Sequence, residues 1–391
     1  MIFNKGNVKV AVKICFILAF LLEMPFNFHV NAHGSQSIQE LINSATSGSV
    51  VQVPSGTYYE NNIEINKSIV LRGAGTIIDG SGGILPIIKV LVSNVTIEGF
   101  TIRNTASSQE TYGIVLKKVS NVTIRNNNLT KCYIGIRIEN SSYCRIVGNQ
   151  IVSNFAYGLF FVSNASNNVV AGNLIKKNRI GLIIYEECTS NKFFHNNFID
   201  NQIQIDYISY LAPHNKFDNG FEGNYWSDYN GADLNLDGIG DEAYNDLDNY
   251  PLMGTFYFIE TESQYGFELI SNLTIVDFTY NTALRELRIN TEGLNGSVGF
   301  CRISIPYALI SPPYSILIDG GQASIHYINY SVYSNSTHQW IYFDYYIYST
   351  QHEIVIIPEG LLHIILPTII IVIVTAVFLK KPYLNLKLKS K

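Results

Sequence analysis

Apolar and polar residues alternate in short runs through the middle of the chain, and these runs recur at a fixed interval. Between Asn94 and Asn201 the pattern returns every 22 to 24 residues, with glycines 22, 23 and 23 residues apart at Gly113, Gly135, Gly158 and Gly181. Each repeat holds two or three stretches of Val, Ile, Leu or Phe with a period of two, which is typical of strands and not of helices. A repeat of this length cannot bury its apolar face alone, so neighbouring repeats must stack. The pattern predicts the successive turns, or coils, of a parallel β-helix.

A column of asparagines runs through these repeats. Each asparagine lies three residues after a member of the apolar column Ile124, Ile146, Val170 and Phe194, and the four asparagines are Asn127, Asn149, Asn173 and Asn197. Asparagine tolerates left-handed backbone angles, and its side chain can hydrogen-bond nearby main chain. Stacked in register, the four side chains are expected to form an internal ladder of amide hydrogen bonds at one corner of each coil.

Residues on both sides of the repeats predict how the coils begin and end. Ile38, Leu41 and Ile42 have helical spacing within 35–44, which predicts a short helix that covers the first coil. Residues 224–253 are rich in Asp, Asn, Gly and Tyr and are expected to close the last coil, so the β-helix domain is predicted over 33–253. Alternating runs separated by turn residues then predict a β-sandwich over 254–358.

The two ends of the chain carry patterns typical of export and membrane insertion. Residues 1–32 contain three lysines, an apolar stretch and the small-residue sequence Val30-Asn31-Ala32, which predicts a signal peptide. Residues 361–379 are apolar over a length that can cross a bilayer, and five lysines follow them. We expect 359–391 to be a transmembrane anchor with a basic cytoplasmic tail, which leaves the bulk of the protein outside the cell. A buried helix is the alternative for the apolar run.

The charge and cysteine content of the segment between these ends narrows the class of partner. Residues 33–360 keep 18 of the 26 basic residues and 30 of the 31 acidic ones, which disfavours nucleic acid as a partner. Ten Asn-X-Ser/Thr triplets suit a glycosylated surface protein, although an asparagine-rich repeat also produces such triplets by chance. Its four cysteines match neither a disulfide framework nor a metal framework, so we expect them to pack in the core.

One short segment has the spacing of a calcium loop. Its candidate ligands are the side chains of Asp233, Asn235, Asp237 and Asp241 and the carbonyl of Ile239. Oxygen donors at alternate positions followed by a glycine suit a hard cation such as Ca²⁺. Tyr244 occupies the twelfth position, where a full EF-hand has a bidentate glutamate. A calcium ion with a structural role is the expected cofactor, and an ion-free acidic turn is the alternative.

Strand alternation also predicts which side chains point away from the core. One outward column contains Val115, Arg137, Phe160, Ile183 and Gln204. Arg137, Phe160 and Tyr185, with Phe193 nearby, form a candidate patch that could stack on sugar rings, because exposed aromatic side chains suit such contacts. Packing beneath another part of the chain is the alternative. Acidic residues occur singly in the outward columns, so paired catalytic carboxylates are not expected and no catalytic residue is assigned. Cysteine, methionine and histidine also lack the spacing of a copper site.

Several motifs resemble those of NosD-like right-handed parallel β-helix proteins. They are Val51-Gln-Val-Pro-Ser-Gly-Thr-Tyr58, Gly73-Ala-Gly-Thr-Ile-Ile-Asp-Gly80, Gly223-Asn-Tyr-Trp-Ser-Asp-Tyr229 and Asp248-Asn-Tyr-Pro-Leu252, within roughly 35–253. The resemblance implies a right-handed coil and an exported protein. It also implies copper binding, since the founding members are described as periplasmic copper-binding proteins that help load nitrous-oxide reductase. The wider superfamily contains carbohydrate-binding and sugar-hydrolysing members.

The hypothesis that best joins these observations is non-catalytic recognition of carbohydrate at the cell surface, with a glycan or envelope component as partner. A copper-binding maturation factor and a polysaccharide lyase or hydrolase are the two alternatives.

Overall fold

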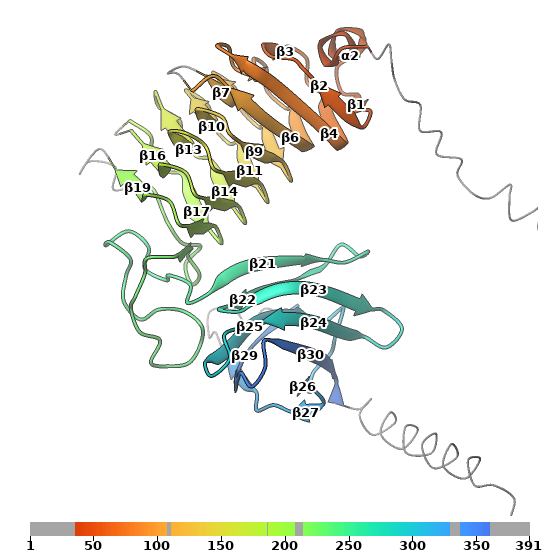
Figure 1. Cartoon of the computed structure of the whole chain (residues 1–391), viewed down its shortest axis with the longest axis vertical. Helices are drawn as coiled ribbons and strands as arrows, with labels where there is room; N and C mark the ends of the chain where they lie inside the picture. The colour runs from red at the N-terminus through yellow and green to blue at the C-terminus, as the bar shows by residue number, and fades with distance from the viewer. Residues whose placement is uncertain (1–35, 108–110, 186, 208–213, 329–336, 360–391) are drawn as a thin grey trace, which may run out of the picture. The chain divides into compact units, whose positions relative to one another are not determined.

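The computed structural model describes residues 36–359 except for 108–110, 186, 208–213 and 329–336 (Figure 1). The expected signal peptide and the apolar run 361–379 lie outside the described residues. Within the described part, no helix has both the length and the apolar character needed to cross a membrane. A short helix, α2 (Ile38–Ser44), precedes a structure built otherwise of strands.

Parallel strands of successive coils build two sheets, which Figure 1 shows stacked from orange to green. The seven-stranded sheet consists of β3 (Ile63–Ile65), β5 (Ile88–Val90), β7 (Tyr112–Lys117), β10 (Ile134–Glu139), β13 (Tyr157–Val162), β16 (Ile180–Ile184) and β19 (Ile203–Tyr207). The 13-stranded sheet consists of β1 (Val50–Val53), β2 (Gly56–Tyr58), β4 (Val70–Gly83), β6 (Thr96–Thr105), β8 (Thr123–Arg125), β9 (Asn128–Thr130), β11 (Arg145–Val147), β12 (Gln150–Val152), β14 (Val169–Ala171), β15 (Leu174–Lys176), β17 (Lys192–Phe194), β18 (Asn197–Ile199) and β20 (Tyr225–Trp226). Middle coils enter this larger sheet twice, as β8 and β9 do.

Residues that are one sequence repeat apart are paired in adjacent strands. Ile114, Ile136, Leu159 and Leu182 are paired in succession, and each side chain is 0% exposed. Residues one repeat apart therefore lie directly over one another, as a parallel stack of strands requires. The prediction of a parallel β-helix is confirmed.

The register corrects two assignments near the last coil. Ile183 pairs with Asp206, so Asp206 and not Gln204 continues the outward column. Val170 pairs with Phe193, so Phe193 belongs to the inward apolar column, where it is 0% exposed, and does not face outward. Counting the apolar column through Phe194 placed the last coil one residue out of register, and a one-residue slip moves every side chain to the opposite face.

The same shift of one residue changes the last predicted member of the asparagine ladder. Each side-chain Nδ2 donates to the Oδ1 of the next member at 2.8–3.1 Å, in the order Asn127, Asn149, Asn173, Asn196 and Asn224. Asn196 and not Asn197 occupies the corner, because it lies three residues after Phe193. Asn197 instead bonds the backbone of Phe256, which follows the coils. Its Nδ2 donates to Phe256 O at 2.8 Å, and its Oδ1 accepts from Phe256 N at 2.7 Å.

Two further ladders occupy the other corners of the coil. One contains Asn154, Asn178 and Asn201, and the other contains Asn168, Asn191 and Asn215. The Nδ2–Oδ1 distances in both are 3.0–3.1 Å. Each Oδ1 also accepts the backbone N–H of the coil before it, as Asn154 does from Cys132 at 3.0 Å. Buried amides that lost these partners would be costly, so the ladders hold each corner in register.

A buried carboxylate ends the first ladder. Asp248 Oδ2 accepts from the backbone N and Nδ2 of Asn224 at 2.7 and 3.3 Å and from Trp226 Nε1 at 2.8 Å, while Oδ1 accepts from Tyr250 N at 3.1 Å. Trp226 stacks between Phe198 and Tyr244, with ring centroids 4.3 Å away on each side. Burial raises the pKa of Asp248 to about 6, although these four hydrogen bonds lower it. The closing loop thus covers the last coil with an aromatic stack and one acid.

Antiparallel sheets of five strands each follow the coils. The first consists of β21 (Thr255–Glu260), β22 (Gly266–Ser271), β25 (Val298–Pro306), β29 (His338–Tyr346) and β28 (His326–Ile328). The second consists of β23 (Thr274–Asn281), β24 (Glu286–Glu292), β30 (Gln351–Pro358), β26 (Tyr314–Ile318) and β27 (Gly321–Gln322). Both sheets contribute to one buried apolar cluster, to which Phe267 and Ile303 belong from the first and Ile289 and Ile356 from the second. Antiparallel β-structure after the coils is confirmed.

A buried ionic cluster joins the last coil, the closing loop and β25. His195 Nε2 lies 2.7 Å from Glu222 Oε2, and Arg302 donates to Glu222 Oε1 from Nε and Nη2 at 3.0 and 2.6 Å. The three residues are 6%, 4% and 1% exposed. The imidazole also stacks on Phe256 at 4.1 Å between centroids. Burial alone would raise the pKa of Glu222, but the charge of Arg302 and the bond from His195 bring it down to about 2.

Replacing Arg302 by Met should destabilise the protein by about 3–5 kcal/mol, because it leaves the buried carboxylate of Glu222 without its cation. Urea denaturation measures the change. Arg288→Met is the matched control, since Arg288 pairs with Glu286 and Glu353 at a half-exposed position and such pairs contribute about 0–1 kcal/mol. Equal losses in the two variants would contradict this account of the cluster.

The acid at the end of the first ladder should give stability a particular pH dependence. Its folded pKa of about 6 lies above that of the unfolded chain, so its contribution is complete below about pH 4 and is lost as pH rises through 6. Asp248→Asn should remove a loss of about 2 kcal/mol between these two pH values. Urea denaturation from pH 4 to 7 tests this, with Asp246→Asn as an exposed control two residues away. A pH profile unchanged by Asp248→Asn would rule out the assignment.

Candidate functional site

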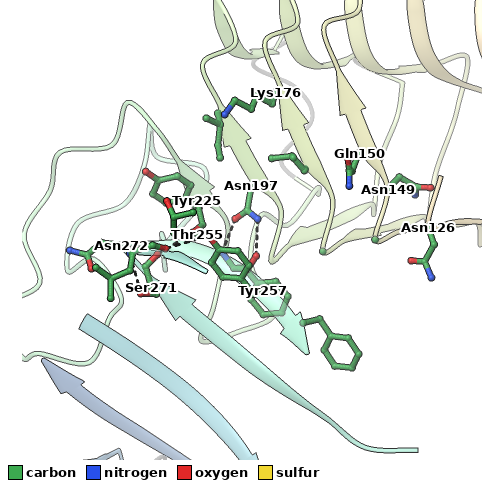
Figure 2. Close-up of a pocket in the computed structure, with 18 of the residues that line it drawn as sticks. Asn126, Asn149, Gln150, Lys176, Asn197, Tyr225, Thr255, Tyr257, Ser271 and Asn272 are labelled. Carbon is green, nitrogen blue, oxygen red and sulfur yellow. Dashed lines mark hydrogen bonds between the residues drawn. The ribbon is translucent and has the colours of Figure 1, made fainter. Parts of the chain in front are cut away.

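A groove of about 670 Å³ runs between the outer face of the 13-stranded sheet and strand β21. Figure 2 shows side chains of successive coils, among them Asn126 and Gln150, on one side of this opening and Tyr257 of β21 on the other. Its lining combines polar and aromatic side chains.

Strand alternation builds one wall of the groove. Side chains that point away from the core stand in register on adjacent strands, and we call this set the groove row: Thr101, Asn128, Gln150, Leu174, Asn197 and Tyr225. Adjacent strands lie about 4.8 Å apart, so the row extends about 24 Å along the coils. Most of its members carry an amide or hydroxyl group, and these groups recur at the strand spacing.

The corner between the two strands of each coil forms the floor. Asn126, Gly148 and Gly172 occupy equivalent corner positions with positive φ angles of 54°, 64° and 66°. This backbone conformation favours glycine and asparagine, because larger side chains with a branched Cβ are strained there. The glycines have no side chain to fill the groove at this corner, so their backbone lines its floor.

The other wall is an edge strand with aromatic side chains. Strand β21 pairs only with β22 in its sheet, and the two hydrogen bonds between Asn197 and Phe256 fix its first residues against β18. Tyr257 lines the groove and its hydroxyl donates to Leu273 O at 3.3 Å. Phe258 also lines the groove and is 54% exposed. A large exposed ring on a rigid strand is typical of a ligand-contact position.

The groove continues toward earlier coils through two smaller hollows of about 300 and 400 Å³. The first shares Asn126, Gly148 and Gln150 with the main groove, and the second shares Asn126 and Glu260 with it. The second is also lined by a charged trio in which Glu98 accepts from Arg72 and Arg125. Burial opposes ionisation of Glu98, but the bonds and charges of the two arginines lower its pKa overall.

This lining combines hydrogen-bonding groups with aromatic rings. Amides and hydroxyls donate and accept hydrogen bonds, and aromatic rings contact apolar faces. Among the residues that line the main groove and its two extensions, the acids are Glu260 and Glu98. Glu98 is engaged by two arginines, which leaves no second free carboxylate beside Glu260 for the paired chemistry of glycoside hydrolysis.

The predicted patch of Arg137, Phe160 and Tyr185 lies elsewhere, on the outer face of the seven-stranded sheet. The structure brings the three residues together: the Arg137 guanidinium lies 5.4 Å from the Phe160 ring centroid, and the Phe160 and Tyr185 rings meet edge to face at 5.2 Å. Phe160 is only 8% exposed, however, because Tyr157, Tyr185 and Arg137 cover it. The idea of an exposed stacking ring at Phe160 is therefore wrong, and the aromatic side chains pack on one another.

Arg137 is also committed to protein contacts. Its Nη1 donates to the Tyr112 hydroxyl, its guanidinium lies 5.1 Å from the Tyr112 ring centroid, and its Nη2 lies 3.1 Å from Glu139 Oε2. A cation held by a ring and a carboxylate on the same sheet stabilises that sheet. A ligand at this place would have to displace those contacts.

The predicted calcium ligands are partly assembled. Asn235, Asp237, Ile239 and Asp241 line one cavity of about 220 Å³. Asp233 does not line it, since its two oxygens accept from the backbone N of Asp237 and Gly238 at 3.1 and 2.8 Å. Burial raises the pKa of Asp237. The described residues contain no group of three or more His, Cys, Asp or Glu side chains arranged to hold a metal ion.

The described residues do not fit a copper ion. Cys132, Cys144, Cys188 and Cys301 are separate buried thiols, and burial raises their pKa values to about 12, 11, 11 and 12. His195 is bonded to Glu222, and His352 Nδ1 lies 2.6 Å from Asp319 Oδ2. Copper requires clustered thiolates or grouped imidazoles. The described part of the chain contains no group of three or more such side chains that could hold a metal ion.

Sequence analysis missed the groove row and β21. The row lies on the strands after each asparagine corner, and its chemistry varies from coil to coil, so periodicity alone does not mark it. Phe258 belongs to a segment that is held in place by Asn197, 59 residues before Phe256. The local sequence of 255–260 is rich in aromatic and β-branched residues, which predicts a strand but does not say what that strand faces.

Comparisons with known proteins give a consistent picture of the coils. The family model described as "Periplasmic copper-binding protein (NosD)" matches residues 27–231. The "Probable ABC transporter binding protein NosD" of Stutzerimonas stutzeri is 29% identical over 146 residues, which are 37% of this chain and 31% of that protein. Its counterpart from Pseudomonas aeruginosa is 28% identical over the same length, with the same shares of the two chains. The matched region thus spans about a third of the length of these relatives.

Solved structures show weaker similarity. A pectin methylesterase crystallised in complex with a hexasaccharide is 15% identical, covering 45% of this chain and 78% of that one, with a TM-score of 0.31. The family model, by contrast, covers more than half of the chain and includes the coils, the groove row and part of the closing loop. This protein therefore belongs to the NosD family.

Proposed function

We propose that the groove binds an extended carbohydrate chain without cleaving it. The observation that carries this proposal is the groove row, opposite the exposed ring of Phe258. Its side chains stand about 4.8 Å apart, and those that offer amide or hydroxyl groups are Thr101, Asn128, Gln150 and Tyr225. A polymer of sugars presents hydroxyl groups at regular intervals and an apolar face on each ring. Hydrogen-bonding side chains at a constant spacing and an aromatic wall complement these two features.

The charges of the groove support a ligand with little net charge of its own. Lys176 and Glu260 both line the main groove, and the Arg72–Glu98–Arg125 trio already neutralises part of itself. Neither sign therefore dominates, so the groove offers no strong field for a highly charged polymer. Specificity would come from hydrogen bonds at fixed positions and from contact with the rings.

Export is part of the same proposal. The description of the family as periplasmic supports an exported location, which brings the groove into contact with envelope or environmental glycans. The apolar run 361–379 stays a prediction of a membrane anchor.

A glycan array probed with the purified protein tests the proposal. The expected result is binding to a subset of oligosaccharides, tighter for longer chains up to the length of the groove row. Titration of the best ligand should then show about tenfold weaker binding for Phe258→Ala, because one ring contact is lost. Phe155→Ala is the matched control, since Phe155 is 51% exposed but does not line the groove.

Two results would count against this function. Silence on every glycan, or equal losses in Phe258→Ala and Phe155→Ala, would contradict binding in the groove. Mass spectra that show shortened oligosaccharides after incubation would replace the binding proposal by that of a lyase or hydrolase.

We also propose that the 233–241 loop binds Ca²⁺ with a structural role, supported by the four oxygen-bearing residues around its small cavity. Millimolar Ca²⁺ should raise the melting temperature by about 5 °C relative to a chelator, because the ion binds only the folded loop. Asp237→Asn should abolish this increment, and Asp277→Asn, an exposed acid on β23, should keep it. Identical melting curves with calcium and with chelator would contradict calcium binding by this loop.

A further inference from the structure

Five of the Asn-X-Ser/Thr triplets fall on one corner of the coils. Each lies after a strand of the seven-stranded sheet and before the next strand of the 13-stranded sheet, in five consecutive coils. We call this set the triplet corner, and its asparagines are Asn66, Asn94, Asn121, Asn140 and Asn164. All five are exposed, whereas the ladder asparagines at the corners are largely buried.

Backbone conformation explains some of these asparagines but not the triplets. Asn94, Asn121, Asn140 and Asn164 have φ angles between 49° and 60°, a region that asparagine tolerates well. That preference places no requirement on the residue two positions later. In all five triplets a half-buried serine or threonine occupies that position. It begins the next strand in two of them, at Thr96 and Thr123, and lies two or three residues before that strand in the others. The turn conformation therefore does not explain why the complete triplet recurs at one edge.

We propose that the triplet corner is an N-glycosylation edge, an inference that rests on the proposed export of the chain. The donor is an oligosaccharide carried on a lipid phosphate, delivered by the host's transferase. The asparagine Nδ2 forms a bond to the anomeric carbon, the bond from that carbon to the phosphate oxygen breaks, and Nδ2 loses one proton. The lipid phosphate leaves with the electron pair of the broken bond.

The fold leaves room for sugars at this edge without blocking the groove. The strands β8, β11 and β14 separate the triplet corner from the corner that carries Asn126, Gly148 and Gly172. A glycan at Asn121 or Asn164 therefore projects from the other end of these strands. Asn128 also begins a triplet, but it stands in the groove row, where an attached sugar would fill the ligand site.

Hydrogen bonding distinguishes the triplet corner from another exposed triplet. At Asn272 the side-chain Nδ2 donates to Val298 O at 3.0 Å and Oδ1 accepts from Phe300 N at 2.9 Å. A sugar on that nitrogen disturbs the contact between β25 and the turn after β22. We expect the folded protein to carry glycans at the triplet corner and none at Asn272 or Asn128.

Neighbouring coils also limit how many glycans fit. The Asn121 Nδ2 lies 3.4 Å from the Asn94 Oδ1, so these two side chains touch. An oligosaccharide is bulkier than the spacing of about 4.8 Å between adjacent strands. Asn94 and Asn121 should therefore compete, with at most one of the two modified in any one molecule.

The test is glycopeptide mass spectrometry of the full chain, purified from a host that attaches glycans to exported Asn-X-Ser/Thr triplets. Thr123→Ala should abolish the glycan at Asn121 and raise the occupancy of Asn94, while Thr123→Ser should keep the wild-type pattern. Both variants leave Asn121 and its backbone conformation in place. Glycan-free triplet-corner peptides from the exported chain would overturn this inference without touching groove binding. Occupancy at Asn272 equal to that at the corner would also overturn it.

Discussion

The hydrogen bond from one buried asparagine to the asparagine of the next coil is the interaction on which the structure depends. Along the ladder, each amide donates to the amide oxygen of the next coil, so identical groups stand directly over one another. Three such ladders, one at each corner, make a slip by one residue costly, because it leaves several buried donors and acceptors without partners. The apolar columns supply most of the stabilisation, and the amides define which residue stacks on which.

The outward side chains inherit this register. Because Asn149 and Asn173 hold their corners over one another, Gln150 and Leu174 on the following strands also stand in line. The constant spacing of the outward side chains therefore results from the register that the buried ladder imposes. Its chemistry is free to vary, since the groove row contributes little to the core. The same scaffold can thus serve different ligands in different members of a family.

The period, strand type and stacking direction could be predicted from the sequence, since each follows from local alternation and a constant repeat length. The last coil could not be aligned by eye, because Phe193 and Phe194 are both apolar and only pairing with Val170 decides between them. The predicted patch at Phe160 shows a different limit of sequence reasoning. Alternation says that Phe160 faces outward, but it does not say that Tyr157 and Tyr185 cover it. The groove could not be predicted because one of its walls is β21, whose position depends on contacts distant in the sequence.

The buried ion pair between Glu222 and Arg302 determines which part of this chain can fold stably by itself. The segment shared with the family ends at residue 231, so it includes the carboxylate but excludes the guanidinium that balances it. Cut at that boundary, the coils would retain an uncompensated negative charge in their interior. The coils and the antiparallel sheets that follow them therefore depend on each other for stability.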